Sequence, residues 1–136
     1  MTPIERLARV LAAGVGATRL WRSLLFLLVV AVSYFALAPV PPAGIDFGWD
    51  KLNHIAAFAA LAISTTLGFP ASRYALRNTV LGLLAYGAMI ELLQLLVPGR
   101  SSDWEDLLAD SIGIACGGII AHSALWASSK LQGHCR

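Results

Sequence analysis

Charged residues are scarce in this chain, because Asp, Glu, Lys and Arg make up only 13% of its 136 residues. A soluble domain carries about 25%. Three long stretches, residues 23–45, 55–72 and 111–129, hold none of these four residue types. A stretch of about 18 uncharged, apolar residues is long enough to cross a bilayer as a helix. This scarcity argues against a disordered chain, a large soluble enzyme and a nucleic-acid-binding protein, and it predicts a small membrane protein.

Cysteine is also rare, with Cys116 and Cys135 the two in the chain. Along one continuous helix these two residues would lie about 28 Å apart, which is too far for a disulfide. We therefore expect two free thiols and no disulfide scaffold.

Apolar residues fill four segments that are long enough to span a membrane. At a rise of 1.5 Å per residue they would be about 27–31 Å long, close to the thickness of the hydrocarbon core. The predicted spans cover about residues 21–38, 52–69, 79–97 and 107–127. Because the loops between them are short, we expect an all-α, polytopic four-helix bundle with residues 1–136 as a single domain.

The segment before the first span allows two interpretations. Thr2-Pro3-Ile4-Glu5 has the features of a helix start, since threonine caps and proline fits the first turn. One interpretation is an amphipathic helix that lies on the membrane surface. The other is a short lead-in to the first span.

Basic and acidic residues fall on opposite sides of the predicted bundle. Eight of the ten Lys and Arg residues lie in the N-terminal segment, the loop after the second span and the C-terminal tail. Seven of the eight acids lie on the other side, together with Lys51 and Arg100. Basic loops stay in the cytoplasm, so we expect both termini to be cytoplasmic and the acidic end to face outward.

Polar residues within three of the spans converge at that acidic end. An ionisable group in hydrocarbon is costly and is by default a functional candidate. Spacings of three and four place several of these groups on shared helix faces. The members of this set are Asp50, Lys51, His54, Glu91, Gln94, Asp106 and Asp110. One polar site at this depth is the economical explanation.

The fourth span carries carboxylates and glycines on one stripe, with Asp103, Asp106, Asp110, Gly113 and Gly117 at spacings of three and four. The small-xxx-small pattern of the two glycines lets another helix approach closely. The two later aspartates should therefore point into the bundle and away from lipid.

Two runs of residues resemble the signatures of the VanZ-like family. The first is Asp50-Lys51-x-x-His54-x-x-x-Phe58, and the second is Glu91-x-x-Gln94-x-x-x-Pro98-Gly99-Arg100-x-x-Asp103-x-x-Asp106-x-x-x-Asp110-x-x-Gly113. The family usually has asparagine where this chain has Asp110. The resemblance implies a multi-pass protein of the bacterial inner membrane with a role in the cell envelope. The family is named for a member linked to resistance against the glycopeptide teicoplanin.

Three residues are candidates for catalysis: His54, Glu91 and Asp106. Histidine titrates near neutral pH, and carboxylates serve as acids or bases. No nucleophile motif accompanies them, so it stays open whether the protein is an enzyme. In the structural alternative, Asp50 or a carboxylate of another helix orients the histidine, and Asp106 caps the start of its helix.

A divalent cation is a further alternative, held by His54, Glu91, Asp106 and Asp110. Oxygen-rich sites suit magnesium or calcium, whereas histidine with carboxylates suits zinc or manganese. Because no strict motif such as His-Glu-x-x-His is present, we expect neither a metal nor another cofactor.

The leading hypothesis is an outward-facing polar pocket that binds an anionic envelope component: a lipid-linked cell-wall intermediate, a phospholipid headgroup or a glycopeptide. Lys51 and Arg100 would attract the anion. The expected ligand-binding residues are Asp50, Lys51, His54, Glu91, Gln94, Arg100, Asp103, Asp106 and Asp110. The alternatives are an intramembrane hydrolase or transferase and a scaffold whose polar network is structural. Membrane lipids are the expected partners, nucleic acid is not, and homo-oligomer formation stays open.

Overall fold

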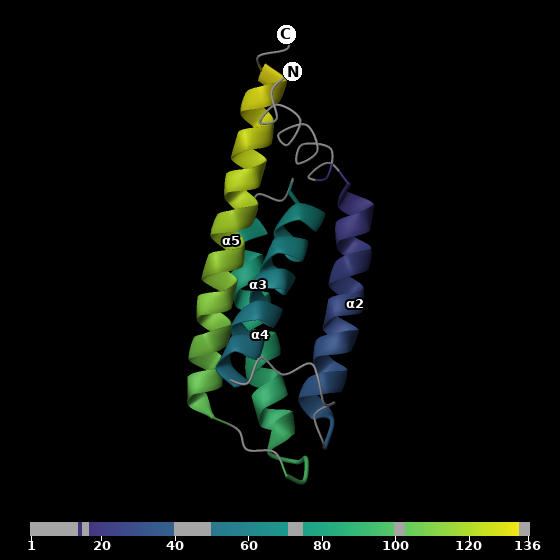
Figure 1. Ribbon diagram of the computed structural model, residues 1–136, viewed down its shortest axis with the longest axis vertical. Coiled ribbons are helices and arrows are strands. Elements are labelled where there is room, and N and C mark those ends of the chain that lie inside the picture. Colours follow the sequence, from purple (N-terminus) through teal and green to yellow (C-terminus); the bar gives the residue numbers. More distant parts are fainter. Residues whose placement is uncertain (1–13, 15–16, 40–49, 71–74, 100–102, 134–136) are drawn as a thin grey trace.

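The computed structural model describes residues 14, 17–39, 50–70, 75–99 and 103–133. Within these ranges the chain forms four helices: α2 (Thr18–Leu37), α3 (Asp50–Gly68), α4 (Ala75–Gln94) and α5 (Trp104–Gly133) (Figure 1). Each helix covers most of one predicted span, so the all-α class is confirmed. The predicted N-terminal amphipathic helix lies outside the described residues.

Three of these four helices are long and apolar enough to cross a membrane. They are Thr18–Leu37, Leu76–Gln94 and Trp104–Lys130. The helix that does not qualify is α3, because Lys51, Asn53 and His54 at its start lower its mean hydropathy. The structure thus supports three of the predicted spans, and a fourth span through α3 stays a prediction.

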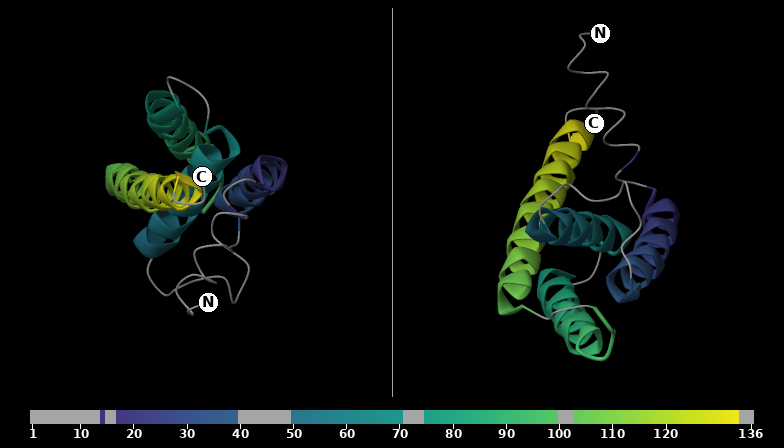
Figure 2. Two further views of the ribbon diagram at one scale, coloured as in Figure 1. Left: turned by 90° about the horizontal axis from the view of Figure 1, so that it is seen from above. Right: turned by 60° about the horizontal axis from the view of Figure 1, so that its bottom comes forward.

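The less apolar helix α3 lies at the centre of the bundle. In the view from above in Figure 2, α2, α4 and α5 stand around it. Its side chains Phe58, Leu61 and Ala62 are fully buried and form the core with Leu83 of α4 and Ile114 of α5. Helix α3 therefore contacts all three other helices, while Leu52 near its start stays 41% exposed.

Two glycines allow α5 to pack directly on the backbone of α3. A Cβ atom added to Gly113 would lie 2.5 Å from the carbonyl oxygen of Ile55, and one added to Gly117 would collide with the carbonyl oxygen of Ala59. Backbones approach this closely only where side chains are absent. The predicted close packing along this stripe is confirmed.

Among the described residues, most basic side chains lie at one end of the bundle and the acidic side chains lie at the other. The start of α2, the end of α3, the start of α4 and the end of α5 lie together at the top of Figure 1. We call this the basic end, since it carries Arg19, Arg22, Arg77 and Lys130. We call the opposite end the acidic end, and it carries Lys51, Glu91, Asp103, Glu105, Asp106 and Asp110.

Several helix boundaries differ from the predicted ones. Helix α4 ends at Gln94 and not near Val97, because turn hydrogen bonds replace the helical pattern there. The turn continues to Gly99, whose φ of +82° suits glycine. Helix α5 has 30 residues and is longer than the predicted span at both ends. At about 45 Å it exceeds the thickness of a hydrocarbon core.

Candidate functional site

Polar side chains from three helices meet inside the acidic end. His54 lies one turn into α3, Glu91 lies in the last turn of α4, and Asp106 and Asp110 lie in the first two turns of α5. Glu91, Asp106 and Asp110 are only 7%, 5% and 1% exposed. We call these four residues the buried polar cluster. The structure brings together residues that the sequence placed at one depth.

A hydrogen bond between α3 and α5 orients the histidine. His54 Nδ1 lies 2.8 Å from Asp110 Oδ1. When the aspartate is ionised, Nδ1–H donates this bond, and the neutral ring then has an unprotonated Nε2. That nitrogen lies 4.0 Å from Asp106 Oδ2, which is longer than a hydrogen bond. A carboxylate of another helix thus holds the ring, while the side chain of Asp50 lies outside the described residues.

Asp110 has room in the core because α4 offers a glycine opposite it. A Cβ atom added to Gly87 would collide with Asp110 Oδ2 and would lie 3.2 Å from the ring of Phe58. This Oδ2 atom is buried and has no hydrogen-bond partner among the described residues. Gly87 was not among the predicted site residues, although its spacing of four from Glu91 places both residues on one face of α4.

Asp103 connects the end of α4 to the start of α5. Its backbone N–H donates to Glu91 Oε2 at 3.2 Å, and its Oδ1 accepts from the backbone N–H of Glu105 at 3.1 Å. The second bond makes Asp103 the N-cap of α5. The alternative in which Asp106 caps this helix is therefore wrong, because Asp106 lies within the first turn with its side chain buried.

Lys51 is the one lysine or arginine at the acidic end within the described ranges. It forms an ion pair with Glu105, and its Nζ lies 3.8 Å from Asp103 Oδ2. The hydrogen bond to Glu105 raises the pKa of Lys51 above its ordinary value of 10.5. The structure directs Lys51 to acids of α5, and Arg100 lies outside the described residues.

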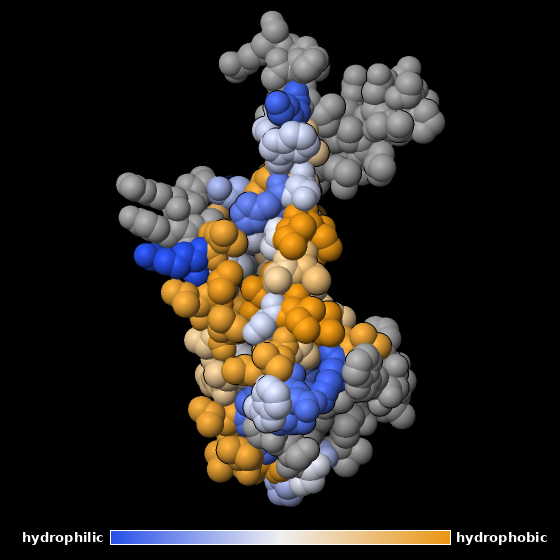
Figure 3. Space-filling model, turned by 90° about the vertical axis from the view of Figure 1, so that its left-hand side faces the viewer, coloured by the Kyte–Doolittle hydropathy of each residue, from blue (hydrophilic) through white to orange (hydrophobic). Residues whose placement is uncertain are grey.

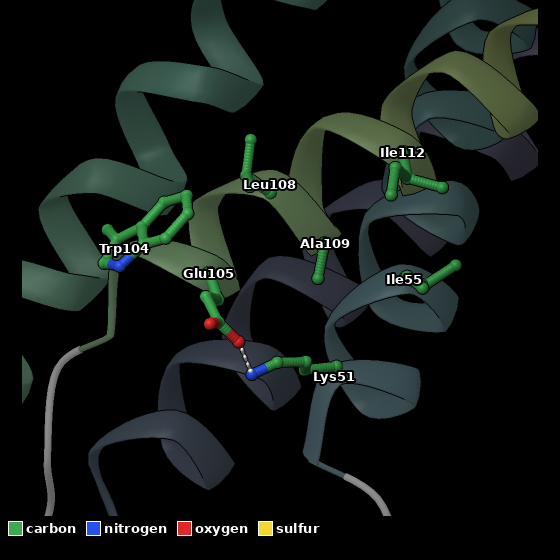
Figure 4. A pocket seen from close by; sticks show the side chains of 7 residues that line it. All are labelled: Lys51, Ile55, Trp104, Glu105, Leu108, Ala109 and Ile112. Atoms are coloured by element: carbon green, nitrogen blue, oxygen red, sulfur yellow. Dashed lines mark ion pairs between the residues drawn. The ribbon is translucent and has the colours of Figure 1, made fainter.

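A shallow groove of about 320 Å³ lies beside this ion pair, between α3 and α5 (Figure 4). Its lining is mostly apolar, and the ion pair closes one part of it. The residues that line it are Lys51, Ile55, Trp104, Glu105, Leu108, Ala109 and Ile112. Figure 3 shows hydrophilic atoms at the lower, acidic end of a largely hydrophobic face. The groove was not predicted, because its lining depends on how the two helices are rotated against each other.

The hydrogen bond that Gln94 donates goes to α2 and not to the buried polar cluster. Its Nε2 donates a hydrogen bond to the carbonyl oxygen of Ala36, at 3.0 Å, and its side chain is buried. The bond joins α4 to α2. In this position Gln94 stabilises the bundle, which is the common role of an amide between membrane helices.

Comparison with known proteins identifies a family. No curated protein and no solved structure matches this chain. The model of the VanZ/LLP1 family matches residues 17–126, a range that includes both signature runs and the whole buried polar cluster. The chain therefore belongs to the VanZ/LLP1 family.

Proposed function

We propose that this VanZ-family protein binds an anionic envelope lipid, a phospholipid or a lipid-linked cell-wall intermediate, in the groove between α3 and α5. The lipid chain lies along the apolar lining, and the anionic headgroup lies at Lys51. The observation that carries the proposal is the composition of the groove, which is apolar between the helices and has a cation at the acidic end.

The proposal includes an arrangement in the bacterial inner membrane. All four helices cross the bilayer, the basic end lies in the cytoplasm, and the acidic end faces outward. The polar first turn of α3 is compatible with this arrangement because it lies at the end of the helix, where Lys51 pairs with Glu105. Lys51 then lies at the depth of the outer headgroups.

The size and lining of the groove favour a lipid over a glycopeptide. Ligand pockets measure about 300–1,000 Å³, so a groove of about 320 Å³ lies at the small end of that range. It accepts a segment of one lipid chain, and its mostly apolar lining offers few partners for the sugars and amides of a glycopeptide. Any effect on glycopeptide resistance would then pass through a lipid-linked intermediate.

The ion pair of Lys51 leaves the lysine able to exchange partners. The side chains of Lys51 and Glu105 are 28% and 47% exposed. Exposed pairs contribute only about 0–1 kcal/mol, and an ammonium has three N–H donors. A phosphate at the headgroup therefore competes readily with the glutamate.

Lipid retention tests the proposal. Protein in nanodiscs of phosphatidylglycerol and phosphatidylcholine is released for native mass spectrometry, and the retained lipids are counted. We expect a preference for phosphatidylglycerol that falls about fivefold in Lys51→Ala, since one lysine near a surface contributes about 1 kcal/mol. Leu108→Trp fills the groove and should lower retention of both lipids.

Ile119→Trp is the matched control, because Ile119 is exposed on the same helix outside the groove lining. It should retain both lipids as the wild type does. The proposal is refuted if the wild type shows no preference for phosphatidylglycerol, or if Lys51→Ala keeps the preference unchanged.

A second candidate function is hydrolysis or group transfer on such a lipid. The bond between His54 Nδ1 and Asp110 Oδ1 favours it, because a carboxylate that holds a histidine ring is a common element of general-base catalysis. Purified protein would be assayed for turnover of lipid-linked phosphate and pyrophosphate substrates. Turnover that is lost in His54→Ala supports catalysis, and an inert wild type across the panel argues for binding alone.

A further inference from the structure

We infer that the buried polar cluster binds a divalent first-row transition-metal ion, with Zn²⁺ as its probe, through His54, Glu91 and Asp106. This site lies between α3, α4 and α5, whereas the lipid groove lies on the outer face of α3 and α5. Metal binding at the cluster does not depend on lipid binding in the groove.

The geometry of the three side chains carries the inference. One ligand atom from each of His54, Glu91 and Asp106 lies within 4.8 Å of the other two. In a tetrahedral site with metal–ligand distances of about 2.1 Å, ligand atoms lie about 3.4 Å apart. Each side chain therefore has to move by less than about 1 Å, which small adjustments of the side-chain dihedrals supply.

The donor set indicates the class of ion. One imidazole nitrogen with two carboxylates suits Zn²⁺ or Mn²⁺ better than Mg²⁺ or Ca²⁺, which take oxygen ligands almost exclusively. Three protein ligands also leave one coordination position open in a tetrahedral ion. The site is thus arranged to hold a water molecule or an oxygen of a ligand beside the protein atoms.

Asp110 supplies the supporting contact that metal-binding histidines commonly have. Such a histidine donates its other ring N–H to a carboxylate, and this bond orients the ring and fixes its tautomer. The 2.8 Å contact between His54 Nδ1 and Asp110 Oδ1 directs Nε2 toward Asp106.

A second observation also favours a cation at this place. Asp110 is 1% exposed, and its Oδ2 has no hydrogen-bond partner among the described residues. The three buried carboxyl groups and the unprotonated imidazole nitrogen offer electron pairs, which suit a cation as ligands and do not suit an anion. A divalent ion beside Asp106 would stabilise the ionised form of Asp110, which lies one turn further along the same helix.

The cluster is close enough to the acidic end for an ion to enter from water. His54 lies four residues after the start of α3, Glu91 three residues before the end of α4, and Asp106 two residues after the start of α5. At 1.5 Å per residue, each is within about 6 Å of a helix end. The ion therefore reaches its ligands without crossing the hydrocarbon core.

Zinc titration of the detergent-solubilised full chain, purified without a histidine tag, tests the inference. Calorimetry should show one Zn²⁺ per chain, and Co²⁺ should give the visible absorption of a site with nitrogen and oxygen ligands. Asp106→Asn and Glu91→Gln keep the side-chain size and should weaken binding more than ~100-fold, beyond the usual effect of losing an outer partner. Asp110→Asn should weaken it about 10-fold, since the amide oxygen still accepts from the ring.

Two control variants separate this site from nonspecific binding. Cys116→Ser removes an exposed thiol of α5, and His122→Ala changes an exposed histidine far along the same helix. Both should bind Zn²⁺ with the wild-type affinity. Circular dichroism and size-exclusion chromatography verify folding of each variant, and if His54→Ala fails to fold, the two size-conserving carboxylate variants decide.

Three results would overturn the inference. The first is a wild type that binds no Zn²⁺ at one ion per chain, and the second is equal Zn²⁺ affinity in the wild type, Asp106→Asn and Glu91→Gln. The third is Mg²⁺ or Ca²⁺ affinity equal to that for Zn²⁺. Retention of phosphatidylglycerol is measured on the same variants, so failure of zinc binding and failure of lipid binding are recorded separately.

Discussion

Replacing Gly117 by alanine isolates the contribution of close packing between α3 and α5, because the neighbouring Gly118 offers a matched control. A Cβ atom at Gly117 would collide with the carbonyl oxygen of Ala59 and would lie 2.9 Å from its Cα. A Cβ atom at Gly118 has no atom within 4 Å. Both positions lie in the middle of α5, so the substitution changes helix propensity equally at each.

The expected magnitudes follow from two opposing terms. Glycine to alanine in a helix interior stabilises by about 1 kcal/mol through propensity. Overpacking costs about 1–3 kcal/mol, and the upper value applies at Gly117 because the opposing atoms are backbone and have no alternative rotamer. We therefore expect Gly117→Ala to lose about 2 kcal/mol of unfolding free energy and Gly118→Ala to gain up to about 1 kcal/mol.

Unfolding by SDS in mixed micelles, followed by far-UV circular dichroism, measures both free energies under one condition. Gly113→Ala should behave like Gly117→Ala, since its added methyl group meets the backbone of Ile55. The reasoning is refuted if Gly117→Ala and Gly118→Ala shift the unfolding midpoint by the same amount in the same direction. In that case α3 and α5 do not pack as closely as described.

Two further substitutions address the other helix contacts. Tyr86→Phe removes the hydroxyl that lies 2.8 Å from Ser33 Oγ and so breaks a hydrogen bond between α4 and α2. The same SDS titration should show a loss of about 0.6–1.7 kcal/mol of unfolding free energy. Unchanged stability would contradict this bond. Arg22→Lys keeps the positive charge but loses two contacts at the end of α3: the Nε–H that donates to the Gly68 carbonyl oxygen at 2.8 Å, and the planar group that lies 4.5 Å from the Phe69 ring centroid. Amide hydrogens at the end of α3 should therefore exchange faster in this variant than in the wild type. Equal exchange rates would show that this contact does not hold the helix end.

The positions of the helices could be predicted because the bilayer limits them. An apolar segment that crosses the membrane needs about 20 residues, so composition alone located the apolar parts of α2, α4 and α5, although α5 continues to Gly133, beyond its predicted end. The glycine stripe was predictable for a similar reason, since Gly113 and Gly117 share a helix face and permit close approach. The sequence also showed that α3 is apolar beyond its first turn, but not that this helix is central.

The details of the polar contacts could not be predicted, because they depend on rotation between helices. Spacing placed His54 and Asp110 at one depth but left open which carboxylate would hold the ring. Lys51 has several acids within reach along the chain, and the rotation of α5 brings Glu105 to it. Asp103 and Asp106 both have the side chain of a cap, and only the start of α5 at Trp104 distinguishes them.

The central position of α3 also bears on how the protein is assembled. This helix brings His54 to the buried polar cluster, and among the described helices it is the one without a stretch apolar enough to qualify as a membrane span. His54 and Lys51 of α3 take their partners Asp110 and Glu105 from α5, the last helix to be synthesised. The polar start of α3 therefore gains these partners only when α5 has packed against it, so a chain truncated before α5 lacks the site.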